Sequence, residues 1–319
     1  MLSNGEKLGA FIVPTGIGAS IGGFAGDASV YARKISEKCK LIVNPNVVNA
    51  ACFSGINENM FYVEGYSLDN FFKGRLNLVP SSDNKIGVVF DKSISQKVLN
   101  VHLNTINAVK TVYGINVIGY EVTDEAVGVD FYKDASGASV GNVKNLSTIK
   151  SAAEKLIHSG ADAIAIVCSF PEDDGEDYAS GIGVDPVGGV EAIISHYISK
   201  ELCVPCAHSP AFENIEISTD IVDARCSAEY ITPTFLPCIL IGLSQAPKLS
   251  NNKGFCIKDL DFLIMPYNSL GGIPVLEMQK LGKPIYGVCE NKTVLDMTKE
   301  KLLIHCTNVK SYIDFIKMI

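Results

Sequence analysis

The chain contains no tryptophan and five histidines, and only 19% of its 319 residues are charged. It has no basic tract and no stretch in which basic and aromatic residues alternate, and its formal net charge is −8. Nucleic acids select clustered lysine and arginine, which this acidic chain does not present. We therefore expect no nucleic-acid partner.

We also expect no secretory leader and no membrane-spanning segment. The first residues, MLSNGEKLG, lack the charged-then-apolar order of a signal peptide, and the apolar stretch 235–243 is too short to span a bilayer. Ten cysteines occur without the spacing of a disulfide scaffold, which favours a reducing compartment. We therefore expect a cytoplasmic protein without a membrane partner, and a hydrophobic content of 47% leaves room for a homodimer.

Short apolar runs alternate with helical patterns along the whole chain, beginning with predicted strands at 10–13, 41–43 and 60–63. This order is typical of parallel sheets. It predicts an α/β fold of two interlocked Rossmann-like lobes with largely parallel sheets, divided softly into 1–135 and 136–319. The apolar segment 235–244 fits a helix or a strand equally well, because periodicity does not separate the two.

The stretch GAFIVPTGIGASIGGFAGD, residues 9–27, is the strongest candidate for a binding site. A predicted strand leads into a glycine-rich loop, and Asp27 precedes a predicted helix. Glycine lets a backbone approach a ligand closely, and the free N–H groups of a helix start attract anions. We expect this loop to bind a small anionic metabolite through Thr15, Gly16, Gly18, Ser20, Gly22 and Gly23.

Further polar and small residues follow predicted strands or precede predicted helices. Ligands of parallel sheets bind at the carboxyl ends of the strands, so these residues join the candidate site. The alternative is that the glycines only permit turns and tight helix packing. The additional binding candidates are Asn46, Asn49, Ser136, Ser139, Gly271, Gly272 and Glu290.

His208 is the first candidate for acid–base chemistry, because it ends a predicted strand and imidazole titrates near neutrality. Asp124 and Glu64 also follow strands and are candidate catalytic carboxylates. The alternative is that His208 only caps a turn. Cys203 and Cys206 precede it in a Cys-x-x-Cys-x-His pattern, but strand alternation places Cys203 on the opposite face, so we expect no metal.

No cofactor is favoured by the glycine loop. Its glycine spacing is not that of a dinucleotide fingerprint, and Asn44 stands where a ribose-binding carboxylate would follow the second strand. A Walker loop would need a Gly-Lys-Ser/Thr sequence, which does not follow. A nucleotide- or cofactor-dependent enzyme and a non-catalytic binding protein remain the alternative functions.

Cys168 lies in the run GADAIAIVCS, residues 160–169. This run resembles the segment that carries a catalytic cysteine in aspartate/glutamate and hydantoin racemases. The resemblance implies a thiol that moves a proton, which makes Cys168 the fourth catalytic candidate. Those enzymes use a second thiol, and the corresponding positions here hold Asn46 and Glu64.

Several longer motifs resemble a domain-of-unknown-function family, number 3326, of bacteria, cyanobacteria and plants. They include IVPTGIGASIGGFAGDA, NPNVVNAA, YVEGYSLDNFFKG, ASGASVGN, CVPCAHSPAF and TFLPCILIGLSQAP. The likeness extends from residue 10 to about residue 295. Asn44, in place of an expected histidine, and Cys168 depart from the family's pattern.

Together these features predict an enzyme that moves a proton on a small carboxylate- or phosphate-bearing metabolite. The reaction would be that of an isomerase, a racemase or a lyase. We expect the acidic, glycine-rich segment 172–183 to close over the site.

Overall fold

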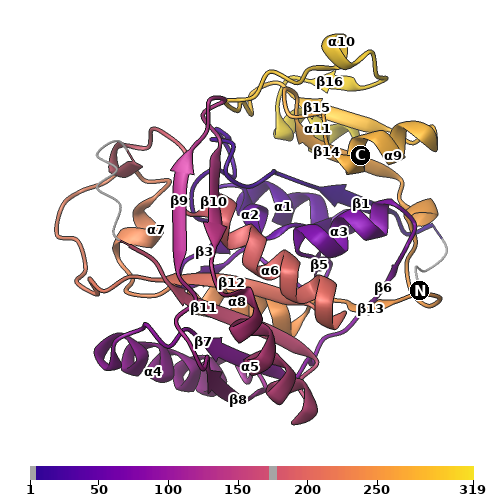
Figure 1. Cartoon of the computed structure of the whole chain (residues 1–319). Coiled ribbons are helices and arrows are strands. Elements are labelled where there is room, and N and C mark those ends of the chain that lie inside the picture. The colour runs from indigo at the N-terminus through magenta and orange to yellow at the C-terminus, as the bar shows by residue number, and fades with distance from the viewer. Residues whose placement is uncertain (1–4, 172–177) are drawn as a thin grey trace.

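The computed structural model describes residues 5–171 and 178–319, and most of its strands form two parallel sheets (Figure 1). The six-stranded sheet has the order β16 (Thr307–Val309), β15 (Ile285–Val288), β14 (Phe262–Pro266), β1 (Leu8–Phe11), β2 (Lys40–Val43), β5 (Met60–Tyr62). The four-stranded sheet has the order β12 (Cys206–Ala211), β11 (Ala163–Ser169), β7 (Ile86–Phe90), β8 (Val117–Val122). All neighbouring strands of both sheets are parallel, which confirms the predicted α/β class.

Helices cover both faces of each sheet, as parallel sheets require. The six-stranded sheet packs against α1 (Ser29–Ser36) and α11 (Tyr312–Met318) on one face and α3 (Gly65–Phe72) and α9 (Ile273–Lys280) on the other. The four-stranded sheet packs against α4 (Gln96–Tyr113) and α8 (Leu236–Ser244) on one face and α5 (Leu146–His158) and α6 (Gly188–Leu202) on the other. The short helices are α2 (Pro45–Val48), α7 (Ser227–Tyr230) and α10 (Lys299–Leu302), with 3₁₀ turns at Tyr178–Ser180 and Ile257–Asp259.

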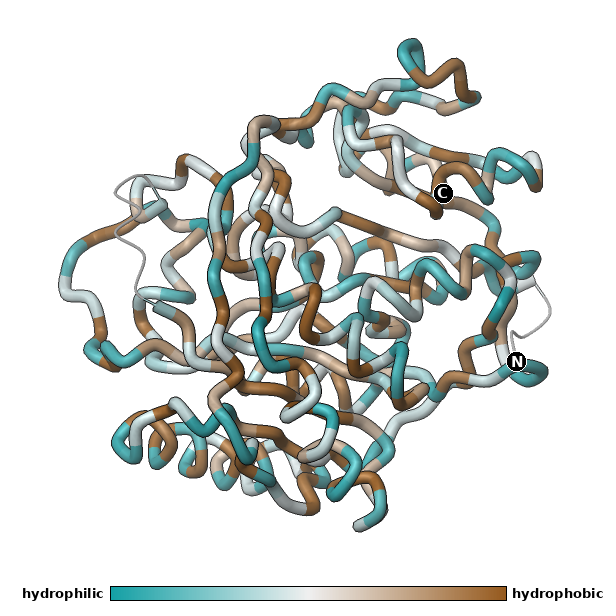
Figure 2. Tube along the Cα trace, viewed as in Figure 1, coloured by the Kyte–Doolittle hydropathy of each residue, from teal (hydrophilic) through white to brown (hydrophobic). Residues whose placement is uncertain are grey.

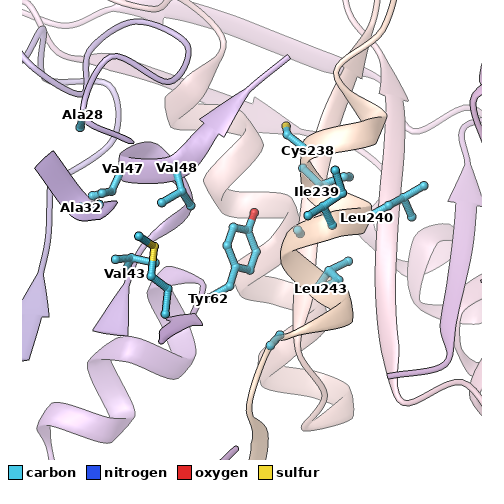
Figure 3. Close-up of a cluster of buried hydrophobic side chains, with 14 of the residues drawn as sticks. Ala28, Ala32, Val43, Val47, Val48, Tyr62, Cys238, Ile239, Leu240 and Leu243 are labelled. Atoms are coloured by element: carbon cyan, nitrogen blue, oxygen red, sulfur yellow. The ribbon is translucent and has the colours of Figure 1, made fainter. Parts of the chain in front are cut away.

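Helix α8 joins the two sheets into one core. All nine of its residues are buried, and one hydrophobic cluster contains α8 together with side chains of both sheets. Figure 3 shows Ile239 and Leu243 of α8 beside Tyr62 of β5 and Val48 of α2. A helix that is buried on every side shows no polar face, which is why sequence periodicity could not distinguish it from a strand.

The two sheets do not follow the expected lobes 1–135 and 136–319. The chain builds the six-stranded sheet from its first 62 residues and from residues 262–309, and the four-stranded sheet from residues 86–211. The two connections between the sheets contain β6 (Asn77–Val79) and β13 (Lys248–Ser250), which pair antiparallel with each other. The four-stranded unit is therefore an insertion into the six-stranded one, and its two linkers are tied together.

Two further hairpins are β3 (Asn49–Ala50) with β4 (Phe53–Ser54), and β9 (Val129–Lys133) with β10 (Ser139–Val143). In Figure 2 hydrophobic and hydrophilic residues alternate along the turns of the outer helix α4, whose buried residues are Val98, His102, Ile106 and Val109. In the parts of the chain that the structure describes, no helix combines the length and the apolar character needed to cross a bilayer.

Gly9 in β1 allows close packing at the centre of the six-stranded sheet. A Cβ atom at this position would lie 2.1 Å from Cζ of Phe262 in the neighbouring strand β14. The Phe262 ring has little freedom to move, because it is buried and packs at 5.2 Å between ring centroids against Phe315. Gly9 therefore leaves room for an aromatic layer under α11.

We expect Gly9→Ala to lower the free energy of unfolding by about 1–3 kcal/mol, the usual cost of overpacking a core. Phe262→Leu removes the ring that the new methyl group would meet. In urea unfolding, the double variant should therefore be more stable than the sum of the two single effects predicts. Simple additivity would show that the two residues do not compete for the same space.

Candidate functional site

A cavity of about 630 Å³ is lined by segments of both sheets. The loop after β1 and the region of α2 contribute from the six-stranded sheet, and the start of α6 and strand β12 contribute from the four-stranded sheet. Residues 212–235 and the start of α8 form the rest of the wall. Residues that follow β1 and β2 therefore line the cavity. They lie at the carboxyl ends of these strands, where parallel sheets bind their ligands.

Five sequence-predicted residues line this cavity: Thr15, Gly23, Asn46, Asn49 and His208. They come from three separate segments, so the fold brings them together from a distance in the sequence. Asn46 also holds the glycine loop in place, because its amide Nδ2 donates to the carbonyl oxygens of Val13 and Gly22.

Backbone N–H groups of the glycine loop bind carboxylates of this chain. The N–H groups of Gly22 and Phe24 donate to Oδ1 of Asp27 at 2.7 and 3.4 Å. The N–H group of Ala25 donates to Oε1 of Glu229 at 3.0 Å. Donors that the sequence assigned to an anionic ligand are therefore already engaged inside the protein.

Gly16 and Gly18 give the same loop its shape. Their φ angles are +72° and +55°, a region that side chains rarely adopt, and a Cβ atom on Gly18 would lie 2.9 Å from Cγ2 of Val184. The carbonyl of Gly16 accepts the N–H of Ser139 at 2.8 Å, which ties the loop to the β9–β10 hairpin. These two glycines act by positioning the loop; neither lies in the cavity wall.

Five carboxyl residues that the sequence analysis did not assign to the site line the cavity, and three of them are not exposed: Asp185, Glu191 and Glu229. Asp185 caps α6, because its Oδ1 accepts the N–H groups of Val187 at 3.0 Å and Gly188 at 3.3 Å. Glu191 lies in the first turn of the same helix, and Glu229 lies on α7. The sequence feature that could have indicated Glu191 is its position as the one acidic residue in GGVEAIIS, residues 188–195, a run that is otherwise small or apolar.

Glu191 is the most deeply buried of the three, with 7% of the residue exposed. Among residues 5–171 and 178–319, no hydrogen-bond donor contacts its carboxyl group; Nε2 of His208 lies 4.0 Å from its Oε2. Burial, followed by the charges of Asp185 and Glu229, raises the pKa of Glu191 well above that of an ordinary glutamate. Burial therefore favours the protonated form of Glu191 in the unliganded protein.

His208 has the opposite shift. Burial, with a smaller contribution from His196, lowers the pKa of His208 to about 3. Its Nδ1 lies 2.8 Å from the hydroxyl oxygen of Ser195, which itself donates to the carbonyl of Ala192 at 3.3 Å. The hydroxyl therefore accepts from Nδ1–H, which leaves the lone pair on Nε2, the nitrogen that faces Glu191.

Glu229 contacts an aromatic residue that also lines the cavity. Its Oε1 accepts the hydroxyl of Tyr178 at 2.9 Å, and the ring of Tyr178 lies 5.0 Å from that of Phe24, between centroids. Burial, followed by the charge of Asp185, raises the pKa of Glu229 to about 8. The expected lid, 172–183, lies partly outside the described residues (172–177), but Tyr178 from its second half lines the cavity.

The other three predicted catalytic residues lie elsewhere. Glu64 caps α3, where its carboxylate accepts the N–H groups of Tyr66 at 2.7 Å and Ser67 at 2.6 Å. Asp124 is exposed at the opposite edge of the four-stranded sheet from His208 and lies 3.5 Å from Nζ of Lys155. Cys168 is 1% exposed inside β11. None of the three lines the described cavity.

The remaining predicted binding residues have contacts within the chain. Ser20 donates to the carbonyl of Lys292, Ser136 donates to Asp134, and Ser139 donates to the carbonyl of Pro186. Glu290 accepts the N–H of Tyr312 at 2.8 Å. Gly271 and Gly272 precede α9, and Gly272 is its N-cap.

The Cys-x-x-Cys-x-His pattern does not form a ligand set. Cys203 is exposed at the end of α6 with a φ of +54°, whereas Cys206 is buried in β12. In the described residues, no group of three or more His, Cys, Asp or Glu side chains is arranged to hold a metal ion.

A family model described as "Protein of unknown function (DUF3326)" matches residues 9–319. The chain belongs to this family. An uncharacterized lipoprotein of Synechococcus sp. is 37% identical over 315 residues, which cover 96% of this chain and 88% of that protein. No solved structure matches the chain significantly.

Membership in DUF3326 confirms the family resemblance of the sequence motifs. The local likeness of residues 160–169 to racemases gains no support from the family or from the Synechococcus relative. The structure of the DUF3326 protein also weakens that likeness, because burial and the nearby Asp91 raise the pKa of Cys168 well above its usual value. A thiol of this kind is a poor nucleophile and a poor base.

We expect Cys168 to resist alkylation by iodoacetamide in the folded protein, while the exposed Cys203 reacts readily. Peptide mass spectrometry after timed labelling measures both residues in one sample. Labelling in urea supplies the control, because both thiols should then react at similar rates. Rapid labelling of Cys168 in the folded state would restore it as a catalytic candidate.

Proposed function

We propose that this protein is an enzyme that moves a proton on a small metabolite bound in the cavity, in a reaction of the isomerase, racemase or lyase type. The observation that supports it is the reversed acid–base order of Glu191 and His208. In water a carboxyl group is the stronger acid, but here burial raises the pKa of Glu191 and lowers that of His208 to about 3. Burial therefore favours a protonated carboxyl and a neutral imidazole in this cavity, and our proposal assigns the two groups these forms at neutral pH.

Such a pair supplies both halves of a proton transfer. The Oε2–Nε2 separation of 4.0 Å is too long for a direct hydrogen bond, so neither group neutralises the other. Neutral His208 accepts a proton from the substrate through the Nε2 lone pair, and protonated Glu191 donates one to another substrate atom. Two groups whose environments push their pKa values apart are typical of acid–base active sites.

Solvent deuterium provides a direct test, because an enzyme that protonates carbon incorporates deuterium from D₂O. The protein is incubated in D₂O with a bacterial small-molecule extract, and mass spectrometry identifies any metabolite that gains mass. We expect incorporation with the wild type and about 10²- to 10⁴-fold slower incorporation with Glu191→Gln or His208→Asn, the usual loss for one acid or base.

Glu154→Gln is the matched control. Glu154 lies on the surface of α5, where it is 3.8 Å from Nζ of Lys150, so its replacement should leave incorporation unchanged. If the wild type incorporates no deuterium into any metabolite that it binds, the protein is a non-catalytic binding protein and the enzyme proposal is wrong.

We also propose a cytoplasmic location. Support comes from the ten cysteines, all of which are free thiols in the structure, as in proteins of reducing compartments. A lipid-anchored location is the alternative, because the Synechococcus relative is named a lipoprotein. Fractionation of cells that produce the native protein distinguishes a soluble from a membrane-associated pool.

A further inference from the structure

The cavity wall is rich in carboxyl groups and poor in cations. Asp185, Glu191 and Glu229 lie inside, and the exposed Glu216 and Asp220 lie at the rim. No lysine or arginine side chain is among the described residues that line it. Carboxyl groups that ionise when a ligand binds attract ligands of positive charge, and no lysine or arginine of the described wall competes for them.

The arginine next to this region does not change that balance. Arg225 donates to Oδ1 of Asp223 and to the carbonyl of Gly181, at 2.9 and 2.8 Å. Its guanidinium also lies 4.8 Å from the centroid of the Phe24 ring. Asp223 therefore compensates the charge of Arg225, and Arg225 is not among the residues that line the cavity.

Glu191 adds an observation that is independent of the charge count. It is a carboxyl group that is more than nine-tenths buried, lines the cavity and receives no hydrogen bond from the described residues. Buried carboxyl groups are almost always paired, because an unpaired one costs free energy. A ligand in the cavity can therefore supply the donor that Glu191 lacks within the described chain.

Aromatic residues that line the cavity are also suited to a ligand of positive charge. The side chains of Tyr178, Tyr230 and Phe235 line the cavity near the carboxyl groups, and ring faces attract cations. The glycine-loop N–H groups of Gly22 and Ala25, which would bind an anion, are occupied by Asp27 and Glu229.

We propose that the cavity binds its ligand through an ammonium group, so that the ligand is a small organic amine in its cationic form. The ammonium donates to Glu191, which gives up its proton when the ligand binds, and Glu229 and Asp185 line the same cavity. In this complex His208 alone accepts the substrate proton and returns it. This inference rests on the cavity used for the proposed function, and it replaces the carboxylate- or phosphate-bearing ligand that the glycine loop alone predicts.

Three four-carbon probes of matched length test the sign of the charge: putrescine, 1,4-butanediol and succinate. We expect putrescine at millimolar concentration to raise the thermal unfolding temperature, because a ligand that binds only the folded state stabilises it. Added sodium chloride should weaken the effect. Butanediol and succinate should leave the temperature unchanged. The proposal is wrong if succinate stabilises the protein or if putrescine does no more than butanediol.

Variants locate the ammonium site. Glu191→Gln keeps the shape of the side chain and breaks no hydrogen bond of the described chain, so it should fold normally. Calorimetric titration with putrescine should show about 10-fold weaker binding for this variant, the usual effect of losing a hydrogen bond to a charged group. Glu154→Gln should bind like the wild type. Equal affinity of Glu191→Gln and the wild type would contradict the assignment.

Proton release gives a second, independent readout. The ammonium selects the ionised carboxyl groups, and the pKa of Glu229 in the free protein is about 8. Affinity for putrescine should therefore increase from about pH 6 to about pH 9, where the amine is still protonated. The other titratable groups that interact with Glu191 or Glu229 are Asp27, Tyr62, Cys168, Tyr178, Asp185, His208, Cys226, Tyr230 and Cys238.

Calorimetry in two buffers of different ionisation enthalpy measures the protons released for each putrescine bound. We expect release near pH 7, and uptake or no change would contradict the proposal. The outcome is separable from the proposed function. Amine binding without deuterium incorporation would overturn the catalytic proposal alone, whereas incorporation into anionic metabolites only would overturn the amine proposal alone.

Discussion

The burial of α8 between two sheets is the constraint on which the rest of this structure depends. Because both sheets pack against this one helix, they cannot separate without exposing it, and a helix that is apolar on every side is not stable in water. The shared core fixes the loops after β1 and β2 opposite the start of α6 and strand β12. The cavity is a consequence of that arrangement rather than of any single loop.

Removal of water from this cavity determines its chemistry. Glu191 and His208 have ordinary side chains, and only their low exposure reverses their order of acidity. The like charges of Asp185 and Glu229 strengthen the shift of Glu191 in the same direction. The cavity therefore favours the protonated forms of its buried carboxyl groups, and the cationic ligand that we propose would displace those protons.

Sequence patterns predicted the strands, the class of fold and one side chain of the cavity wall, because these depend on local information. The apolar runs at 41–43, 86–90 and 163–167 are strands of parallel sheets. His208 lines the cavity, although it lies inside β12 and not at the end of a strand as the sequence predicted. Asp124 also follows a predicted strand, but it lies far from the cavity. The reason is that β8 and β12 are the opposite edge strands of one sheet, and local sequence patterns do not give the order of strands in a sheet.

Other features required the three-dimensional structure. Glu191 and Glu229 are far apart in the sequence and become neighbours only when α6 and α7 meet at the cavity. The sequence also did not reveal how the chain is divided between the two sheets, because residues from both ends of the chain form the six-stranded sheet. The glycine loop was recognised, but its donors are satisfied by Asp27 and Glu229, which lie 5 and 204 residues away from the N–H groups that they accept.

The central claim is that Glu191 is protonated next to a neutral His208 at neutral pH. Infrared difference spectroscopy between the wild type and Glu191→Gln tests it, because a protonated carboxyl group absorbs apart from carboxylates and amides. The account predicts that the wild type shows a protonated-carboxyl band at pH 7 that shifts in D₂O and is absent from the variant. A spectrum in which the variant instead loses a carboxylate band would contradict it.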